Sequence, residues 1–421
     1  HLDLVPNEYK LSSHLVPNAI GDKAYLQAPC VSPWRTIMMS DDARDIVSSK
    51  MIFNLNDPSK IEDTSWIKPM KYVGVWWEMH VGKSTWDYAG SQNAQNAADG
   101  QLKPTGKHGA TTENTKRYID FAAKNGFDGV LVEGWNVGWE DWFGNWKENV
   151  FDFVTPYPDF NLKEVNDYAK SKGIKMIMHH ETSGSVANYE RHLDRALNLM
   201  KEYGYPAAKS GYVGRIIPRG EFHDGQTMVN HFNFVASRFA DYKLMINSHE
   251  SSRPTGYSRT YPNYIAAEAA RGNEFNAWSN GNPPMHETIL PFTRLLGGPM
   301  DYTPGIFEIK MSAYDPKKTE QVHTTLAKQL VLYVTMYSPL QMAADLPENY
   351  EKYPDAFQFI KDVAVDWQDS KYLEAEPGDY LTVARKEKNG ERWCLGANTD
   401  ENARQTEIKL DFLSPNNKYE P

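Results

Sequence analysis

Carboxylate, imidazole and amine side chains end a series of short apolar runs in this sequence. These runs finish at Glu78, Glu133, His179-His180-Glu181, Lys209 and His249-Glu250. A single carboxylate in such a place is usually a solvated loop residue. Its repetition at the ends of several apolar runs favours one shared site instead. Grouped carboxyl and imidazole groups can exchange protons with a substrate, and carboxylate oxygens can bind a hard cation such as Ca²⁺.

Other common catalytic motifs are absent from the sequence. It has no G-x-S-x-G serine hydrolase elbow, and Leu290 stands where an H-E-x-x-H motif beginning at His286 would need its second histidine. No phosphate-binding P-loop is present either, because His108 follows Lys107. The remaining carboxylates, histidines and aromatic residues suit glycoside hydrolysis, in which a carboxylic acid and a carboxylate act on opposite sides of the scissile bond.

Two further glutamates, Glu268 and Glu274, lie six residues apart with Gly272 between them. They could face the same site across a turn. They could equally lie on the exposed face of a helix, and the spacing does not decide between the two arrangements.

Composition limits the function classes. The chain has 421 residues, a net charge of −10, 40% hydrophobic residues and 13% aromatic residues. This is ample for a folded core, and the aromatic excess favours flat ligands such as sugars. A net-acidic chain without a basic stripe argues against a nucleic-acid partner, and no apolar run is long enough for membrane insertion. Cys30 and Cys394, the only cysteines, exclude a disulfide framework and a thiolate metal cluster.

Strand-like apolar runs alternate with helical patterns through most of the chain. The runs cover residues 71–77, 126–135, 173–181, 207–213 and 243–250, with shorter candidates near Glu274, Asp301 and Ser338. Helical spacing covers residues 112–123, 162–171, 187–203 and 228–242. The alternation predicts parallel βαβ units, and about eight of them over residues 66–375 predict an α/β protein with a (β/α)8 TIM barrel. A doubly wound sheet is the alternative that periodicity leaves open.

The segments on either side of the barrel region differ from it in composition and in hydrophobic pattern. Residues 1–65 are rich in proline and loops, and we expect them to lean on another part of the protein. Residues 376–421 predict antiparallel strands at 380–384, 392–395 and 406–410, with an Asn389-Gly390 hairpin signal. The polar stretch 91–111 is a candidate active-site lid.

The ordered motifs resemble those of glycoside hydrolase family 97, which contains bacterial α-glucosidases and α-galactosidases. The matching stretches run in order through most of residues 60–421. They are Val73-Gly74-Val75-Trp76-Trp77, Glu133-Gly134-Trp135-Asn136, His179-His180-Glu181-Thr182, Lys209 through Gly214, His249 through Gly256, Arg259 through Asn263, and Glu268 through Glu274. The resemblance implies that residues 1–65 are the remnant of an N-terminal β-sandwich plus a linker. It also implies that 376–421 are a partial C-terminal β-domain, and that a missing part of the sandwich packs on the barrel.

The likeness is greatest to the calcium-dependent, inverting α-glucosidase of a starch-utilisation system. It implies that Glu274 is the general acid and that Glu181 and Glu250 hold and deprotonate the attacking water. It further implies that Ca²⁺ binds to Glu250, Glu268 and Glu274. The positions that would contact the sugar are Glu133, His179, Lys209 and His249. Trp76 and Trp77 are added as candidate sugar-binding residues, although most tryptophans in a barrel simply pack.

The two branches of the family differ at the end of the fourth barrel strand. The retaining α-galactosidases carry an Asp nucleophile there, whereas this chain reads Lys209-Ser210-Gly211-Tyr212. We therefore expect an exo-acting, inverting α-glucosidase that hydrolyses maltose and maltooligosaccharides with calcium assistance. By the same resemblance it would act in the periplasm. The alternatives are a family member for another sugar, such as an α-galactoside, and a non-catalytic glycan-binding protein.

Overall fold

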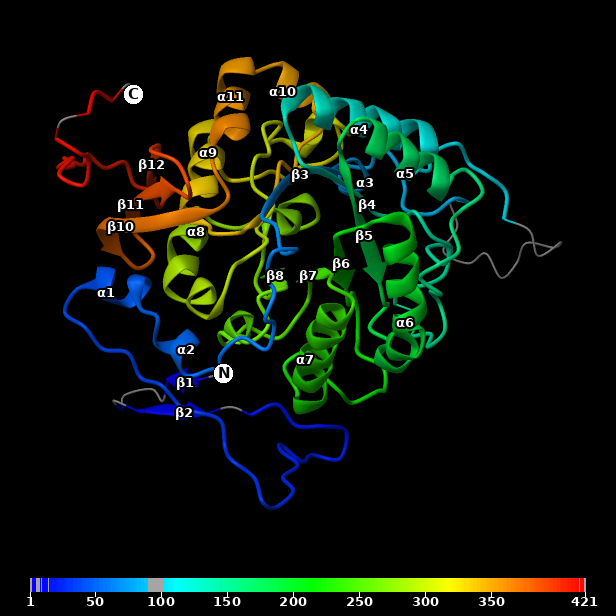
Figure 1. Ribbon diagram of the computed structural model, residues 1–421, viewed down its shortest axis with the longest axis horizontal. Coiled ribbons are helices and arrows are strands. Elements are labelled where there is room, and N and C mark those ends of the chain that lie inside the picture. Colours follow the sequence, from blue (N-terminus) through cyan, green and yellow to red (C-terminus); the bar gives the residue numbers. More distant parts are fainter. Residues whose placement is uncertain are drawn as a thin grey trace.

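A computed structural model of the chain describes residues 2–4, 8, 10–13, 15–89, 102–144, 146–415 and 417–419. Its centre is a seven-stranded parallel sheet in the order β8-β7-β6-β5-β4-β3-β9, which curves into a nearly closed barrel (Figure 1). The strands are β3 (Met70–Val75), β4 (Gly129–Val132), β5 (Lys175–Glu181), β6 (Ala207–Gly211), β7 (Met245–Ser248), β8 (Tyr264–Ala267) and β9 (Leu340–Met342). The predicted TIM-barrel fold is confirmed, and the doubly wound alternative is excluded.

Helices surround the strands on the outside of the barrel (Figure 1). The longer ones are α4 (Thr112–Asn125), α5 (Leu162–Ser171), α6 (Val186–Tyr203), α7 (Gln226–Asp241), α9 (Leu326–Thr335) and α11 (Pro354–Asp362). The short ones are α3 (Trp77–His80), α8 (His286–Ile289) and α10 (Pro347–Glu351), with 3-10 turns η2 (Tyr257–Arg259), η3 (Asn273–Ala277), η4 (Leu290–Phe292), η5 (Arg294–Gly297) and η6 (Met311–Ala313). Helix α4 shows why the sequence signals work: the Thr111 side chain accepts from the backbone N of Asn114, and Gly126 ends the helix at φ 73°.

The eighth barrel position is irregular. Residues 299–304 lie between β8 and β9 but do not form a regular strand. The backbone N of Ala267 donates to Pro299, and that of Asp301 donates to Ala267. On the other side, the backbone N of Met300 donates to Tyr337. This segment links the two edge strands, so it completes the ring in place of the eighth strand that we predicted near Asp301.

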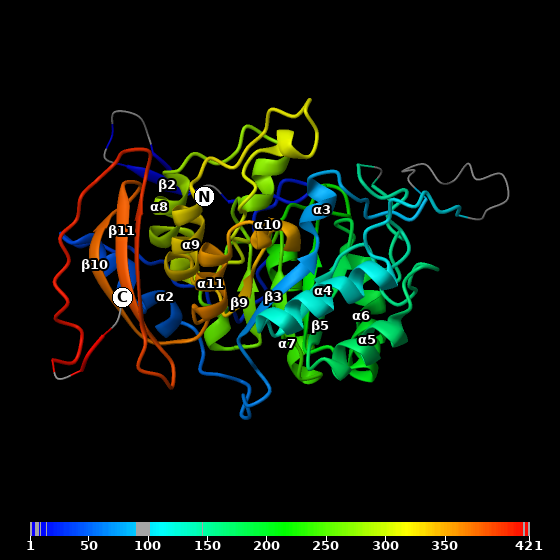
Figure 2. The same ribbon diagram turned by 90° about the horizontal axis from the view of Figure 1, so that it is seen from above.

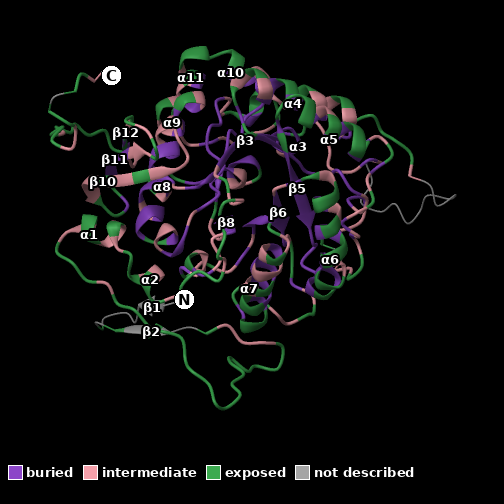
Figure 3. Cartoon of the chain, viewed as in Figure 1, coloured by how far each residue is buried: buried purple, intermediate pink, exposed green. Residues whose placement is uncertain are grey.

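Burial follows the barrel. The strands are buried on both faces, whereas the outer helices expose one face to solvent (Figure 3). This pattern is expected for a parallel sheet whose crossover helices cover it. No helix in the described parts of the chain combines the length and the apolar character needed to cross a bilayer.

The flanking segments form separate small sheets. β1 (Leu2–Leu4) and β2 (Leu11–Ser13) pair antiparallel, and α1 (Ala43–Ser48) and α2 (Met51–Asn54) follow. β10 (Trp367–Glu376), β11 (Tyr380–Glu387) and β12 (Trp393–Thr399) form an antiparallel sheet at one end of the molecule, away from α4, α5 and α6 (Figure 2).

Two expectations about these segments need comment. The C-terminal sheet begins at Trp367, before the predicted domain start at residue 376, because the bulged strand β10 shows no clear period-two pattern. The strand predicted at 406–410 is wrong, since these residues form no strand in the structure. Of the candidate lid 91–111, the part up to residue 101 lies outside the described residues.

Candidate active site

Parallel register brings the polar strand ends to one end of the barrel. His179 on β5 lies beside Lys209 on β6, and Lys209 lies beside Asn247 on β7. Oε1 of Glu133, which follows β4, is 2.8 Å from Nζ of Lys209 and 3.4 Å from Nε2 of His179. All three side chains are buried. The predicted residues Glu133, His179 and Lys209, with the strand neighbour Asn247, therefore meet at one edge of the barrel, as an active site of this fold requires.

Charge pairing makes Glu133 and Lys209 an ionised couple. Burial by itself raises the pKa of Glu133, but His179 and Lys209 outweigh it and hold the pKa well below its usual range. Burial lowers the pKa of Lys209, yet the charge of Glu133 raises it above the ordinary value. His179 is neutral at pH 7, because burial lowers its pKa to about 4. The couple gives the site a fixed acceptor and a fixed donor for hydroxyl groups.

Glu181 lies at the carboxyl end of β5. Its Oε1 accepts from the backbone N of Ser183 at 2.7 Å and from that of Val213 at 3.2 Å. Its Oε2 lies against Gly211, so closely that a Cβ added at that position would collide with it. Burial and the neighbouring Glu250 raise the pKa of Glu181 well above its ordinary value.

Glu250 and Glu268 are joined through the backbone. The N–H of Glu250 donates to Oε2 of Glu268 at 3.1 Å, and Oε2 of Glu250 accepts from the N–H of Tyr212 at 2.6 Å. Glu250 has a φ of 46°, a left-handed conformation that is uncommon for a glutamate and that turns its side chain into the site. Burial, with Glu274 nearby, raises the pKa of Glu250 to about 7, and burial raises that of Glu268 to about 7.

Glu274 lies on the turn η3 rather than on the strand that we expected near it. Its side chain is 24% exposed, and Oε2 is 3.8 Å from Nε2 of His80. Glu250, Glu268 and Glu274 line one open cavity of about 430 Å³. The arrangement of Glu268 and Glu274 across a turn is therefore the one the structure contains, and the exposed-helix arrangement is excluded.

The same cavity offers a place for a cation. His249, Glu268 and Glu274 each offer a possible ligand atom, and these three atoms all lie within 4.8 Å of one another. Among the described residues, this is the one group of three histidine, cysteine or acidic side chains with that spacing. Glu250, a predicted ligand, lines the same cavity. Burial and, after it, repulsion among these carboxyl groups raise the pKa values of Glu250 and Glu268, and a divalent cation would relieve the repulsion. The carboxylate oxygens of Glu250, Glu268 and Glu274 suit Ca²⁺, which takes oxygen ligands, whereas the ring nitrogen of His249 does not.

The tryptophans occupy two different settings. Trp76 and Trp77 are fully buried and belong to the core cluster inside the barrel, although Nζ of Lys209 lies 5.2 Å from the Trp76 ring centroid. Trp86 is only partly buried, and its Nε1 donates to Oε2 of Glu133 at 3.0 Å. Trp86 thus touches the carboxylate of a predicted sugar-binding residue directly.

Sequence comparison agrees with this geometry. The family model described as Glycoside hydrolase 97 matches residues 76–270. The model described as Glycosyl-hydrolase 97 C-terminal, oligomerisation matches residues 366–421, and the model described as Glycosyl-hydrolase 97 N-terminal matches residues 7–58. A glycoside hydrolase family 97 enzyme from Pseudoalteromonas sp. strain K8, in complex with acarbose, is 49% identical, with a TM-score of 0.81 over 90% of this chain and 57% of that chain. The chain belongs to glycoside hydrolase family 97.

The relatives of this chain within family 97 are named for different activities or bound sugars. The retaining α-galactosidase of Bacteroides thetaiotaomicron is 31% identical over 396 residues, which are 93% of this chain and 53% of that protein. A variant of the Pseudoalteromonas enzyme in complex with panose is 48% identical over 90% of this chain. The chain spans about half the length of the curated relatives that it matches.

Three site residues of this family 97 chain escaped the sequence reasoning. His80 and Trp86 follow β3 on α3 and the next loop, where no apolar strand end marks them. Asp301 lies on the irregular eighth segment, with Oδ2 2.8 Å from Nε2 of His249. The sequence analysis named Asp301 only to locate a short strand candidate. A carboxylate beside a predicted strand was the signal that could have identified it as a site residue.

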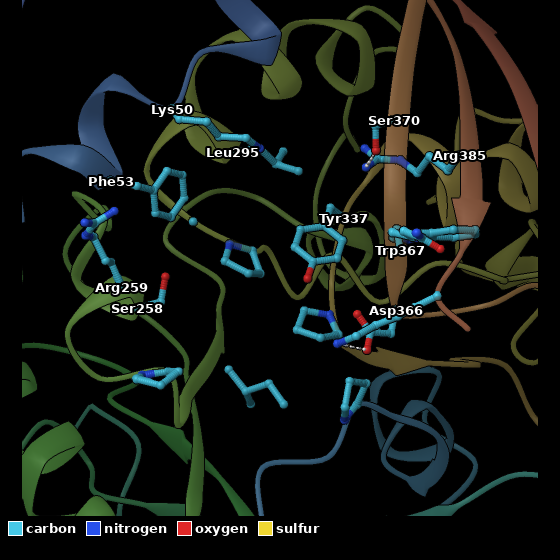
Figure 4. A pocket seen from close by; sticks show the side chains of 18 of the residues that line it. Lys50, Phe53, Ser258, Arg259, Leu295, Tyr337, Asp366, Trp367, Ser370 and Arg385 are labelled. Carbon is cyan, nitrogen blue, oxygen red and sulfur yellow. Dashed lines mark hydrogen bonds and ion pairs between the residues drawn. The ribbon is translucent and has the colours of Figure 1, made fainter. Parts of the chain in front are cut away.

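A larger cavity lies away from this site. It has a volume of about 950 Å³ between α1–α2, the segments preceding β3 and β9, and the sheet β10–β11. Phe53, Tyr337 and Trp367 come from these three different parts of the fold and line it (Figure 4). It opens at the amino ends of the strands, opposite the carboxylates, so we assign the chemistry to the smaller carboxylate-lined cavity.

Proposed function

We propose that this chain carries the active site of an exo-acting, inverting α-glucosidase. The observation that carries this proposal is the position of Glu181 in front of Gly211 at the end of β6. The retaining branch, by the resemblance described above, needs a nucleophilic Asp at the end of this strand. A side chain at position 211 and the observed Glu181 carboxylate would need the same space, so the present arrangement favours a mechanism without that nucleophile.

The residues divide into an acid and a water-binding pair. Glu274, the more exposed carboxyl at the cavity, would donate a proton to the glycosidic oxygen as the bond breaks. Glu181 and Glu250 would hold the water and accept its proton on the opposite face of the sugar. A pKa of about 7 leaves a useful fraction of Glu250 ionised at neutral pH, as a general base requires.

The buried couple of Glu133 and Lys209, with His179, would bind the hydroxyl groups of the terminal sugar. Because its donors and acceptors are fixed before substrate arrives, little reorganisation is needed on binding. Ca²⁺ held by Glu250, Glu268 and Glu274 would supply positive charge beside the sugar. The carboxylates of this chain would otherwise repel one another and a substrate oxygen.

The choice of an α-glucoside over another sugar rests on likeness. The structural relative with 48% identity was studied in complex with panose, a trisaccharide of α-linked glucose. The retaining α-galactosidase at 31% identity favours the alternative that the chain acts on an α-galactoside. A glycan-binding protein without activity would have no need for the set of Glu181, Glu250 and Glu274.

Hydrolysis of p-nitrophenyl α-glucoside and α-galactoside, each with and without EDTA, tests the proposal. We expect release of nitrophenol from the glucoside, loss of the rate on chelation, and at least a 100-fold lower rate on the galactoside. A Glu250→Gln variant, which lacks the proposed base, serves as the control for contaminating hydrolases, because p-nitrophenolate is a good leaving group that can depart without the acid Glu274. Preference for the galactoside would support the alternative, and binding of maltose without any turnover would support a glycan-binding protein.

A further inference from the structure

The cavity of about 950 Å³ at the amino ends of the barrel strands has the build of a ligand site. Its aromatic walls come from three parts of the chain: Phe53 lies on α2, Tyr337 lies between α9 and β9, and Trp367 begins β10 (Figure 4). Sites for small organic ligands typically have volumes of about 300–1,000 Å³ and walls of this kind. The apolar faces of such rings suit the flat side of a sugar.

The charged residues around this cavity are mostly basic, although the chain as a whole has a net charge of −10. The basic residues of the lining are Lys50, Lys68, Arg259, Arg385 and Lys388. The lining also has two acidic residues, Asp366 and Asp369, and a lysine 2.9 Å away neutralises each of them. Within the described part of the chain, all the basic residues of the lining except Lys388 lack an ion pair. This excess of positive charge favours an anionic occupant.

Arg385 is buried, with 6% of its surface exposed, unlike the other basic residues of the lining. It lies on β11, where its Nε donates to the carbonyl of Val334 at 2.6 Å and its Nη1 donates to the hydroxyl of Ser370 at 2.8 Å. Its guanidinium carbon lies 5.8 Å and 5.9 Å from the ring centroids of Tyr337 and Tyr372. These contacts fix the guanidinium but supply no counterion among the described residues. A buried charge without a counterion is unfavourable, so an anion in the cavity would complete the site.

We propose that this cavity is a second ligand site, which takes a saccharide carrying an anionic group such as phosphate or carboxylate. The anion would bind to the guanidinium of Arg385, which presents its N–H donors in one plane. The sugar ring would pack against Tyr337 and Trp367. This binding is separate from the carboxylate-lined cavity and from the reaction proposed there. Because α2, the barrel and β10 each supply a wall, the bound saccharide would also hold these three parts together.

Trp367 gives a direct readout of occupancy. In the whole chain labelled with ¹⁵N-tryptophan, a Trp367→Phe variant assigns the indole N–H signal. We expect glucose 6-phosphate and glucuronate to shift this signal at concentrations at least about 10-fold lower than glucose does, because a hydrogen bond between two charged groups is worth about that factor. Maltose, which has no anionic group, should behave like glucose.

The same titration contains the results that would contradict the proposal. The comparison of glucose 6-phosphate with glucuronate tells phosphate from carboxylate as the preferred group. A Trp367 signal that neither compound moves would overturn the proposal, and a signal that inorganic phosphate moves at the same concentration would overturn the assignment to a saccharide. A signal that follows protein concentration instead would mean that a second copy of the chain fills the cavity, which would also overturn it.

Arg385→Gln removes the buried guanidinium and should raise the Kd of the anionic saccharide by about 10- to 100-fold. The matched control is Lys386→Gln, which removes the same charge one residue along β11, where Lys386 pairs with Glu391 at 3.2 Å and does not line the cavity. This control should keep the affinity. Equal affinities in Arg385→Gln and the unsubstituted chain would overturn the role of Arg385. If Arg385→Gln does not fold, the Trp367 titration of the unsubstituted chain still decides whether the site exists.

Discussion

Oε2 of Glu181 occupies the space that a side chain at Gly211 would need. Glu181 ends β5 and Gly211 ends β6, and the two residues are paired in the parallel register. The end of the fourth barrel strand can therefore hold either a side chain of its own or the Glu181 carboxylate of its neighbour. Because the two side chains cannot occupy this space together, the glycine at position 211 supports the mechanism that we propose.

Gly211→Ala should displace Glu181 and reduce kcat by about 100-fold or more, because displacing a catalytic group by about 1 Å costs roughly that factor. Steady-state kinetics would measure the loss. Gly129→Ala is the matched control, since Gly129 is also a buried strand glycine, and its added Cβ would lie 3.1 Å from the Lys175 carbonyl at the other end of the barrel. The control should lose about 1–3 kcal/mol of stability but keep its activity. A fully active Gly211→Ala variant would contradict the placement of Glu181.

Lys209→Met should destabilise the chain by about 3–5 kcal/mol, because it leaves the buried charge of Glu133 without its partner. Urea unfolding would measure the change. The double variant Glu133→Gln/Lys209→Met should recover part of the lost stability, and Lys163→Met, which breaks the exposed pair with Asp167, should change little. A Lys209→Met variant as stable as the unsubstituted chain would show that Glu133 is not held as an ion in the folded state.

The raised pKa of Glu268 predicts a pH-dependent stability. Its folded-state pKa of about 7 lies above the ordinary 4.5, so the folded chain retains a proton that the unfolded chain releases. This contribution is complete below about pH 4.5 and is lost as pH rises to about 7. In EDTA, Glu268→Gln should therefore gain stability relative to the unsubstituted chain across that window, by at most about 3 kcal/mol.

Comparison of the two chains by urea unfolding at several pH values tests this. The buried His179, with its pKa lowered to about 4, acts in the opposite direction: its contribution is lost as pH falls from 6.5 toward 4. Both chains contain His179, so its effect cancels in the difference. A difference that is constant with pH would contradict the assignment to Glu268.

Calcium should stabilise the chain, since a cation relieves the repulsion among Glu250, Glu268 and Glu274. At a concentration 100 times Kd the gain should be about 2.7 kcal/mol. Thermal unfolding with and without EDTA would show it, and the gain should be larger at pH 8 than at pH 5 because the ligands must be deprotonated. Glu268→Gln should lose the response. An identical response in that variant would place the cation elsewhere.

Sequence reasoning located the regular part of this fold well, for a physical reason. Buried parallel strands are continuous apolar runs, so their carboxyl ends are visible where the run meets Glu133, Glu181 or Lys209. Helix α5 was predicted with its observed bounds because its apolar spacing is a local signal.

The remainder of the site depends on tertiary contacts. Asp301 reaches His249 from a segment with no strand pattern, and Trp86 reaches Glu133 from a loop, so neither contact follows from local periodicity. Glu274 lies on a 3-10 turn, and β8 precedes it as a four-residue strand too short to stand out. Trp76 and Trp77 followed a recognisable strand, but the sequence could not show that both are buried in the core.

The most direct test of the account is the configuration of the sugar when it is first released. With maltotriose as substrate, ¹H NMR in the first minutes distinguishes the two anomers before mutarotation mixes them. The inverting site that we propose, with Glu274 as acid and with Glu181 in front of Gly211, predicts that β-glucose appears first. Initial release of α-glucose would contradict it, because retention needs a nucleophile for which this strand end has no side chain.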